Sequence, residues 1–492
     1  MGRQRTRTDS NSASIKGRCE SSRDSALLFN LVSLSLSLNP FFKKKQSAPR
    51  PDERPSSSMN TSLSSSSFPA PASAAATEPK PTTKTTIAIA LDPATAAAAA
   101  ADPFSLVAPE VEALSQRLRE CVVATAVPVL STAAEYFFRA GSTGKRLRPT
   151  LVLLMAGATA PPLGYKATSP PSSSSSSSTS SEDDALPPRP SSTPFFPAPT
   201  RDDALVDTRP PSSPPPNPRR AAQRLAEIAE LIHVASLLHD DVIDDAALRR
   251  GLAAVNAVLG NKVSVLAGDF LLARASVSLA SLRDHGVTLL MSRVIEDLVA
   301  GEVAQMSARG DDLVSLESYE RRCFLKTASL MSRSSQAAAL LSGADSHAAE
   351  LAARYGESLG LAFQVTDDAL DYDLGSSALS LGKPAAADAK AGVVTAPPLL
   401  AMMDTGEGGR TKDAEELEAL VRRRFKQKGD PARAAELVRL GRGCEKAREL
   451  AARHADEAVN ALRQLPPPAH EHGAACRVAL EALARAVVQR KK

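Results

Sequence analysis

The sequence predicts an all-α protein, and three observations carry this prediction. From Arg219 to the C-terminus, apolar residues recur at intervals of three and four, which is the spacing of an amphipathic helix. Ala, Leu, Glu and Arg dominate this part of the chain. Strand-like alternation and glycine-rich turns are both few. We therefore expect helices that pack on helices.

The predicted helices make a core of about 320 residues, which one helical domain can accommodate. The first helical segment begins after Pro103, where a Ser- and Pro-rich sequence gives way to apolar residues at helical spacing. The predicted helical ranges are 104–158, 220–246, 262–282, 287–308, 317–341, 346–371 and 431–463.

Two segments of the chain lack this pattern. Residues 1–103 are rich in Ser, Ala, Thr and Pro, with more basic than acidic residues, a composition typical of an organelle-targeting segment. We predict a disordered leader there. Residues 161–219 are again rich in Ser and Pro, so we predict a disordered insertion between two helices. The folded domain would then be 104–492, interrupted by 161–219.

Composition excludes several classes of protein. The net charge is only +4, there is no Trp, and aromatic residues make up 4%, so a nucleic-acid partner is disfavoured. No apolar run reaches the length of a membrane span, and we predict no transmembrane segment. The five cysteines are scattered without metal-type spacing, and we expect reduced, packing thiols: Cys19, Cys121, Cys323, Cys444 and Cys476.

A first aspartate cluster ends a strongly apolar helical run, LIHVASLLHDDVIDD. Its members are Asp240, Asp241 and Asp244. On a helix, Asp240 and Asp244 lie about 40° apart on one face. Carboxylates one turn apart suit Mg²⁺, which takes one or two protein oxygens and completes its shell with water and phosphate. Taken alone, a cluster of this kind is more often a solvated acidic helix end than a metal site.

A second cluster repeats the arrangement in FQVTDDALDY, after another apolar helical run. It comprises Asp367, Asp368 and Asp371, and Gln364 lies one turn earlier on the same face. Two such clusters would repel each other if they met without cations. Several bound Mg²⁺ ions between them would remove that cost and create a seat for a diphosphate.

Basic residues near these clusters are candidates for holding phosphate oxygens. Each of them taken alone is better explained as a surface charge than as a ligand. His233 precedes Asp240 by seven residues, and the pattern leaves open whether it is a core histidine or a ligand. The candidate cations are Lys145, Arg148, Arg249, Arg250, Lys326 (followed by Thr327) and Lys383.

The chain resembles the trans-isoprenyl diphosphate synthases, and among them the long-chain polyprenyl (solanesyl-type) enzymes. The matching segments occur in the family's order: GKRLRP, LLHDDVIDDAALRRG, KTASLMS, FQVTDDALDY and LGKPAAADAKAGVVTAPPLLAM. The resemblance implies an isoprenoid-synthase-type helical bundle around a central apolar cavity, usually a homodimer. The insertion and the long leader are the two departures, and neither touches a motif.

The resemblance also implies a role for each candidate residue. The magnesium and diphosphate ligands would be Asp240, Asp241, Asp244, Asp367, Asp368 and Asp371, with Asp240, Asp244, Asp367 and Asp371 essential for catalysis. Isopentenyl diphosphate would contact Lys145, Arg148, His233 and Arg250. The allylic diphosphate would contact Arg249, Lys326, Thr327, Gln364 and Lys383. In the family, bulky residues before the first cluster stop chain growth, and here Ala235 and Ser236 are small, which favours a long product.

The expected activity is repeated condensation of isopentenyl diphosphate with an allylic diphosphate, serving a ubiquinone or plastoquinone side chain. A short-chain geranylgeranyl or geranyl diphosphate synthase is the alternative, because it differs only in cavity depth. A non-catalytic subunit of a heteromeric synthase would be expected to lose one cluster, and a terpene cyclase would carry more aromatic residues. The leader then predicts a mitochondrial address, with the plastid as the alternative.

Overall fold

The structure is a computed structural model that describes residues 92–123, 146–161, 217–249, 252–373, 386–403, 405–406 and 409–490. Helices make up almost all of the regular structure in these ranges, which confirms the all-α prediction. The strands described there form two short antiparallel pairs, β1 (Leu248–Arg249) with β2 (Leu252–Ala253) and β3 (Thr405–Gly406) with β4 (Gly409–Arg410).

The helices vary from single turns to rods of more than seven turns. The α-helices are α2 (Pro93–Ala101), α3 (Ala108–Val123), α5 (Leu147–Thr159), α6 (Pro218–Ile243), α7 (Val255–Leu259), α8 (Asn261–Ser281), α9 (His285–Ser307), α10 (Leu316–Cys323), α11 (Ser329–Leu341), α12 (Ser346–Tyr372), α14 (Ala387–Ala391), α15 (Ala396–Met402), α16 (Lys412–Arg422), α17 (Asp430–Leu440), α18 (Gly443–Arg463) and α19 (Glu471–Val488). Two short 3₁₀ turns are η2 (Ser105–Val107) and η3 (Gly310–Leu313), and η4 (Phe324–Ala328) is a π-helical turn.

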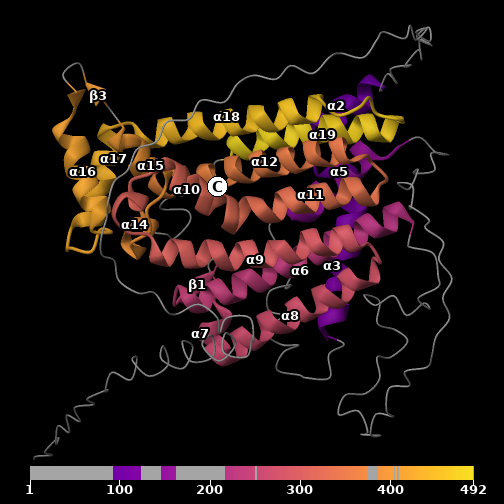
Figure 1. The fold of residues 1–492 in the computed structure, drawn as a ribbon, viewed down its shortest axis with the longest axis horizontal. Helices are drawn as coiled ribbons and strands as arrows, with labels where there is room; N and C mark the ends of the chain where they lie inside the picture. The colour runs from indigo at the N-terminus through magenta and orange to yellow at the C-terminus, as the bar shows by residue number, and fades with distance from the viewer. Residues whose placement is uncertain are drawn as a thin grey trace, which may run out of the picture. The chain divides into compact units, whose positions relative to one another are not determined.

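The long helices pack side by side around one apolar core (Figure 1). Leu151, Ile228, Met331 and Tyr355 are completely or almost completely buried in it. The Tyr355 hydroxyl donates a hydrogen bond of 2.7 Å to the carbonyl of Leu480, so the one polar atom of this buried ring is satisfied. A second apolar cluster lies between α10, one end of α12, the shorter helices α15 to α17 and the first half of α18.

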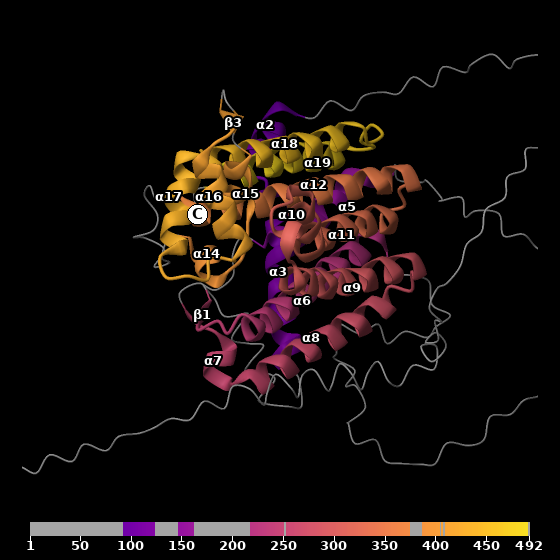
Figure 2. The same cartoon turned by 60° about the vertical axis from the view of Figure 1, so that its left-hand side comes forward.

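Helix α6 and helix α12 end at the same side of the bundle. The hairpin that follows α6 and helix α14, which follows α12, both lie at the left in Figure 1, and the turned view of Figure 2 keeps them on one side. Side-chain caps fix where these helices start, because Asn217 accepts from the Arg220 amide and Asp345 accepts from the Ala348 amide. The two aspartate clusters are therefore carried to one end of the fold.

Three predicted boundaries were wrong. Residues 93–101 lie in the predicted leader but form α2, because Asp92 caps an alanine run with Pro at N1 and Ala99 packs into the core. Helix α6 begins at Pro218, inside the predicted insertion. The single helix predicted over 431–463 is broken at Arg442, whose φ is 52°, and α18 begins at Gly443, where a Cβ would come 2.3 Å from the carbonyl oxygen of Pro397. Residues 1–91, 124–145 and 162–216 lie outside the described residues, so the rest of the leader and insertion predictions is untested.

Helix α8 is, within the described ranges, the one helix whose length and composition would allow it to cross a membrane, and 39% of its most apolar window is buried. One such helix is weak support for a span, because core helices share these properties. The cysteines that the structure describes, Cys323, Cys444 and Cys476, are free, as predicted for them.

Candidate active site

Asp240 and Asp244 lie one above the other at the C-terminal end of α6. Burial raises the pKa of Asp240 to about 6, against the opposing positive charge of Lys326, and the negative charges of Glu302 and Asp244 raise it further. Burial also raises the pKa of Asp244, again with Lys326 opposing and Glu302 reinforcing the change. At both carboxylates the effect of burial thus outweighs the positive charge of Lys326, and the pKa values stay raised.

Asp241 has a different environment from its neighbours. It is 1% exposed, and both of its carboxylate oxygens accept hydrogen bonds from Nε of Arg249, at 2.9 and 2.8 Å. Its carbonyl accepts a further bond from the Asn256 amide at 3.0 Å. Asp241 therefore fastens the β1–β2 hairpin and α7 to the end of α6, and the geometry argues against the predicted metal contact of Asp241 and the predicted substrate contact of Arg249.

The second cluster divides in the same way. Asp368 is 3% exposed and accepts hydrogen bonds from the Tyr319 hydroxyl at 2.5 Å and from the Gln364 amide at 2.8 Å. Burial raises its pKa to about 6 despite these donors. Asp371 lies one turn beyond Asp367 and accepts from the backbone amide of Asp388 at 3.0 Å. Asp368 is thus a buried anchor, which argues against its predicted metal contact.

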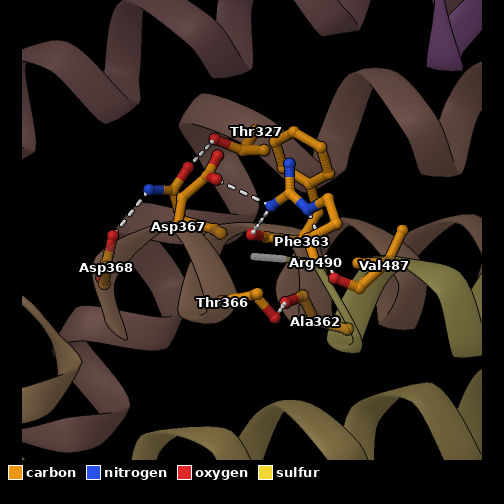
Figure 3. A network of polar contacts seen from close by, with 9 residues as sticks. Thr327, Ala362, Phe363, Thr366, Asp367, Asp368, Val487 and Arg490 are labelled. Carbon is orange, nitrogen blue, oxygen red and sulfur yellow. Dashed lines mark hydrogen bonds and ion pairs between the residues drawn. The ribbon is translucent and has the colours of Figure 1, made fainter. Parts of the chain in front are cut away.

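The π-helical turn η4 connects the two clusters. Lys326 Nζ lies 2.5 Å from Glu302 of α9, and its charge acts on Asp240 and Asp244. The next residue, Thr327, donates to the Gln364 side-chain oxygen at 2.8 Å, which continues to Asp368 (Figure 3). Lys326 therefore acts on the first cluster, and its neighbour Thr327 belongs to the hydrogen-bond network of the second. Single π-helical turns are frequent at functional sites.

Two glycines let η4 approach its neighbours closely. A Cβ at Gly301 of α9 would come 2.7 Å from Lys326 Cγ, and a Cβ at Gly360 of α12 would come 2.5 Å from Ala328 Cα. Real Cβ atoms essentially never show contacts this short. The missing side chains on both sides thus determine where Lys326 and Thr327 lie.

Arg148 of α5 and His233 of α6 meet between the two helices. Arg148 Nη1 lies 3.0 Å from His233 Nε2, although their roles toward a substrate remain predictions. Ala235 is fully buried, and the hydroxyl of the partly buried Ser236 bonds back to the carbonyl of His233 at 2.9 Å. The predicted ligands Lys145, Arg250 and Lys383 lie outside the described residues.

Sequence reasoning missed three residues that the structure brings to the clusters. Glu302 pairs with Lys326, Tyr319 bonds Asp368, and Arg490 Nη2 lies 2.7 Å from Asp367 Oδ1. Glu302 had a usable signal, because Gly-Glu interrupts an otherwise apolar helical face. Tyr319 and Arg490 had none, since their partners lie 49 and 123 residues away in the chain.

The donor set fits a hard divalent cation such as Mg²⁺. Asp240, Asp244, Asp367 and Asp371 are not fully buried, and their carboxylates are the oxygen ligands that Mg²⁺ prefers. Within the described residues no three acidic, His or Cys side chains lie close enough together to hold one ion, so water and substrate oxygens would have to complete its shell. Burial is the main cause of the raised pKa values of Asp240 and Asp244, with a smaller contribution from Glu302, and a bound cation would offset both effects. The fold and the site together define an all-α protein with an acidic centre suited to a cation and a multiply charged anion.

Comparisons with known proteins agree with this class. The family described as "Polyprenyl synthetase" matches residues 205–438. The chain is 41% identical over 391 residues to the mitochondrial solanesyl-diphosphate synthase 1 of Oryza sativa subsp. japonica, covering 80% of this chain and 79% of that protein. It is also 41% identical to a probable mitochondrial hexaprenyl pyrophosphate synthase of Neurospora crassa, covering 74% of this chain and 78% of that protein. The chain therefore belongs to the polyprenyl synthetase family.

Solved structures support the same assignment. A polyprenyl synthase from Caulobacter crescentus CB15, complexed with calcium and isoprenyl diphosphate, matches with a TM-score of 0.59 and 30% identity over 80% of this chain and 98% of that one. The apo form of an Arabidopsis medium/long-chain length prenyl pyrophosphate synthase matches with a TM-score of 0.54 and 34% identity, over 80% and 100%. The predictions of the family and of its helical fold are confirmed, and members of the family are trans-prenyltransferases.

Proposed function

We propose that this protein condenses isopentenyl diphosphate repeatedly with an allylic diphosphate to give a long all-trans polyprenyl diphosphate for a quinone side chain. The observation that carries the proposal is the pair of aspartate clusters at one end of the bundle, joined by the turn that bears Lys326 and Thr327. Relatives named as solanesyl, hexaprenyl and decaprenyl diphosphate synthases support the long product.

Mg²⁺ is the proposed cofactor, held by Asp240, Asp244, Asp367 and Asp371. When bound, it would neutralise the diphosphate of the allylic substrate and favour its departure. The raised pKa values at the first cluster support a cation there, and the similar Caulobacter enzyme was solved with calcium and isoprenyl diphosphate.

The chain's own residues then position the substrates and stabilise charge. Lys326, already held at the first cluster by Glu302, supplies a cation for the allylic diphosphate, and Arg148 beside His233 supplies one for isopentenyl diphosphate. The allylic carbon–oxygen bond breaks, the isopentenyl double bond forms the new carbon–carbon bond, and a proton is lost to restore an allylic diphosphate. No covalent nucleophile takes part, and catalysis rests on orientation and electrostatics.

Product length is the feature that separates the proposal from a short-chain synthase. Ala235 and Ser236 precede Asp240 by about one turn, and neither is large enough to form a floor beneath a growing chain. Each further methylene would gain about 0.8 kcal/mol on burial among apolar helices.

Chromatography of products from labelled isopentenyl diphosphate and an allylic primer tests the function. We expect products longer than geranylgeranyl diphosphate. Ser236→Tyr should shorten them and leave the first condensation intact. A wild-type enzyme that stops at geranylgeranyl diphosphate would establish the short-chain alternative, and a chain inactive until mixed with a second subunit would establish the non-catalytic one.

We also propose that two copies associate through α8 and α9. Large apolar side chains are exposed on these neighbouring helices at Leu266, Val277, Val299, Val303 and Met306, each at least 45% exposed. An exposed apolar surface of this kind marks a protein contact. Light scattering should give the dimer mass for the wild type and the monomer mass for Val299→Glu combined with Val303→Glu.

The proposed location is the mitochondrion, which the names of the rice, Neurospora and Yarrowia relatives support. A relative named "Solanesyl diphosphate synthase 3, chloroplastic/mitochondrial" keeps the plastid as the alternative. Residues 1–103 fused to a fluorescent protein should accumulate in mitochondria, and accumulation in plastids would favour the alternative.

A further inference from the structure

The C-terminal end of α19 places a positive charge on the second aspartate cluster. Arg490 Nη2 donates to Asp367 Oδ1 at 2.7 Å and to the carbonyl of Phe363 at 3.3 Å. Its Nε donates to the Val487 carbonyl at 3.2 Å, and its guanidinium carbon lies 4.0 Å above the centre of the Phe363 ring (Figure 3). Contacts to α12 and α19 thus hold this guanidinium in one place. A freely moving surface arginine would lack these contacts.

The position of Arg490 conflicts with a metal ion at the same carboxylate. Asp367 is one of the outward-facing aspartates, with 43% of its side chain exposed, whereas Arg490 is 25% exposed. A divalent cation bound through Asp367 Oδ1 would take the oxygen that accepts the Arg490 hydrogen bond. It would also lie beside a positive guanidinium that the Phe363 ring and two carbonyls hold in place.

We propose that Arg490 is a built-in counter-cation that neutralises Asp367 in the metal-free protein and is displaced when a divalent cation binds. This proposal rests on the proposed metal site. Arg490 accordingly lowers the metal affinity of the second cluster, and metal binding releases its guanidinium from Asp367 and Phe363. The position of Arg490 is thereby coupled to metal occupancy.

Removing the charge should therefore strengthen metal binding. The test uses the full chain, with Mn²⁺ as the probe, no substrate, and titration calorimetry at fixed ionic strength. Arg490→Gln should bind Mn²⁺ about 1.5-fold to 5-fold more tightly, the range set by one partly exposed charge pair. Arg485→Gln is the matched control, because Arg485 lies five residues earlier, in the last turn of α19, but pairs with Glu481 and is 62% exposed. It should bind Mn²⁺ as the wild type does.

A double variant isolates the contact. In an Asp367→Asn background, Arg490→Gln should no longer change Mn²⁺ affinity, since its target carboxylate is gone. Unchanged or weaker binding by Arg490→Gln with an unaltered melting temperature would overturn the proposal. Wild-type protein that binds Mn²⁺ no better than Asp371→Asn would instead refute the metal site itself, and the role of Arg490 with it.

A second measurement needs no variant. Phenylglyoxal modifies accessible arginines, and mass spectrometry reports the rate at each one. Mn²⁺ should accelerate modification of Arg490 severalfold, because the guanidinium leaves Asp367, and should leave Arg485 unchanged. An Arg490 rate that does not respond to saturating Mn²⁺ would show that the metal does not displace it.

Discussion

Replacing Asp240 by Asn should make the metal-free protein more stable while it weakens metal binding. The pKa of Asp240 is about 6 in the folded protein, compared with 3.8 for an unperturbed aspartate, and burial is the main cause. Each step of one in pKa corresponds to about 1.4 kcal/mol. The ionised carboxylate thus costs the folded state about 3 kcal/mol above pH 6, and an uncharged amide of the same shape removes that cost.

The sign of the effect depends on pH in a defined way. Because the folded pKa is raised, the penalty develops as pH rises through the unfolded pKa of 3.8 and is complete above pH 6. The gain from Asp240→Asn should be largest at pH 8 and about half as large at pH 5. The amide also changes local hydrogen bonds, so we expect a net gain of about 1–3 kcal/mol at pH 8.

Thermal unfolding in chelator measures this gain, and the next residue is its control. For a domain of this size, the gain corresponds to a melting temperature higher by about 2–8 °C. Asp241→Asn is the same chemical change one position later, but it weakens the bonds to Arg249 and should lower the melting temperature instead. Saturating Mg²⁺ should stabilise the wild type and leave Asp240→Asn unchanged.

The reasoning is refuted if Asp240→Asn lowers the melting temperature in chelator at pH 8. It is equally refuted if both variants respond alike, because the two carboxylates would then have the same environment. Stabilisation of Asp240→Asn by Mg²⁺ to the same extent as the wild type would remove Asp240 from the metal site.

Three further predictions follow from single contacts. Gly360→Ala should lower the free energy of unfolding by about 1–3 kcal/mol, because the new Cβ would overlap Ala328 Cα. Gly286→Ala is the control: no atom lies nearer than 3.4 Å to its Cβ, and the loss should be under about 1 kcal/mol. Tyr319→Phe leaves the buried Asp368 with one donor fewer, so we expect a loss of about 1–3 kcal/mol and little change in Mn²⁺ affinity. Mn²⁺ affinity of the wild type should fall about tenfold per pH unit below pH 6, because Asp240 must lose its proton to bind, and a titration that is flat between pH 7 and 5 would contradict this.

Helical periodicity alone predicted most of the long helices, because each buries one face against its neighbours. The predicted range 346–371, for example, matches α12 to within one residue. The break at Arg442 could not be predicted, since the periodicity of 431–463 does not show that Gly443 packs against the backbone of α15. Periodicity says which face is buried but not what lies against it.

The aspartate clusters were visible in the sequence, but the division within each was overlooked. Consecutive residues of a helix lie about 100° apart but residues three apart lie only about 60° apart, so spacing separates Asp241 from Asp240 and leaves it near Asp244. The same holds for Asp368, which is separated from Asp367 but not from Asp371. Only the structure shows that one aspartate of each cluster is buried, with Arg249 and Tyr319 as the partners.

The position of η4 shows why the remaining contacts needed a structure. Lys326 and Thr327 are adjacent in sequence, yet one acts on the first aspartate cluster and the other joins the network of the second. This division requires η4 to lie close to α9 and α12 at once, which Gly301 and Gly360 permit because neither has a side chain. A larger residue at either glycine would push η4 away from one helix. The distance between a cation and its carboxylates is thus set by glycines that carry no charge themselves, and changes to uncharged packing residues should alter the electrostatics of this site.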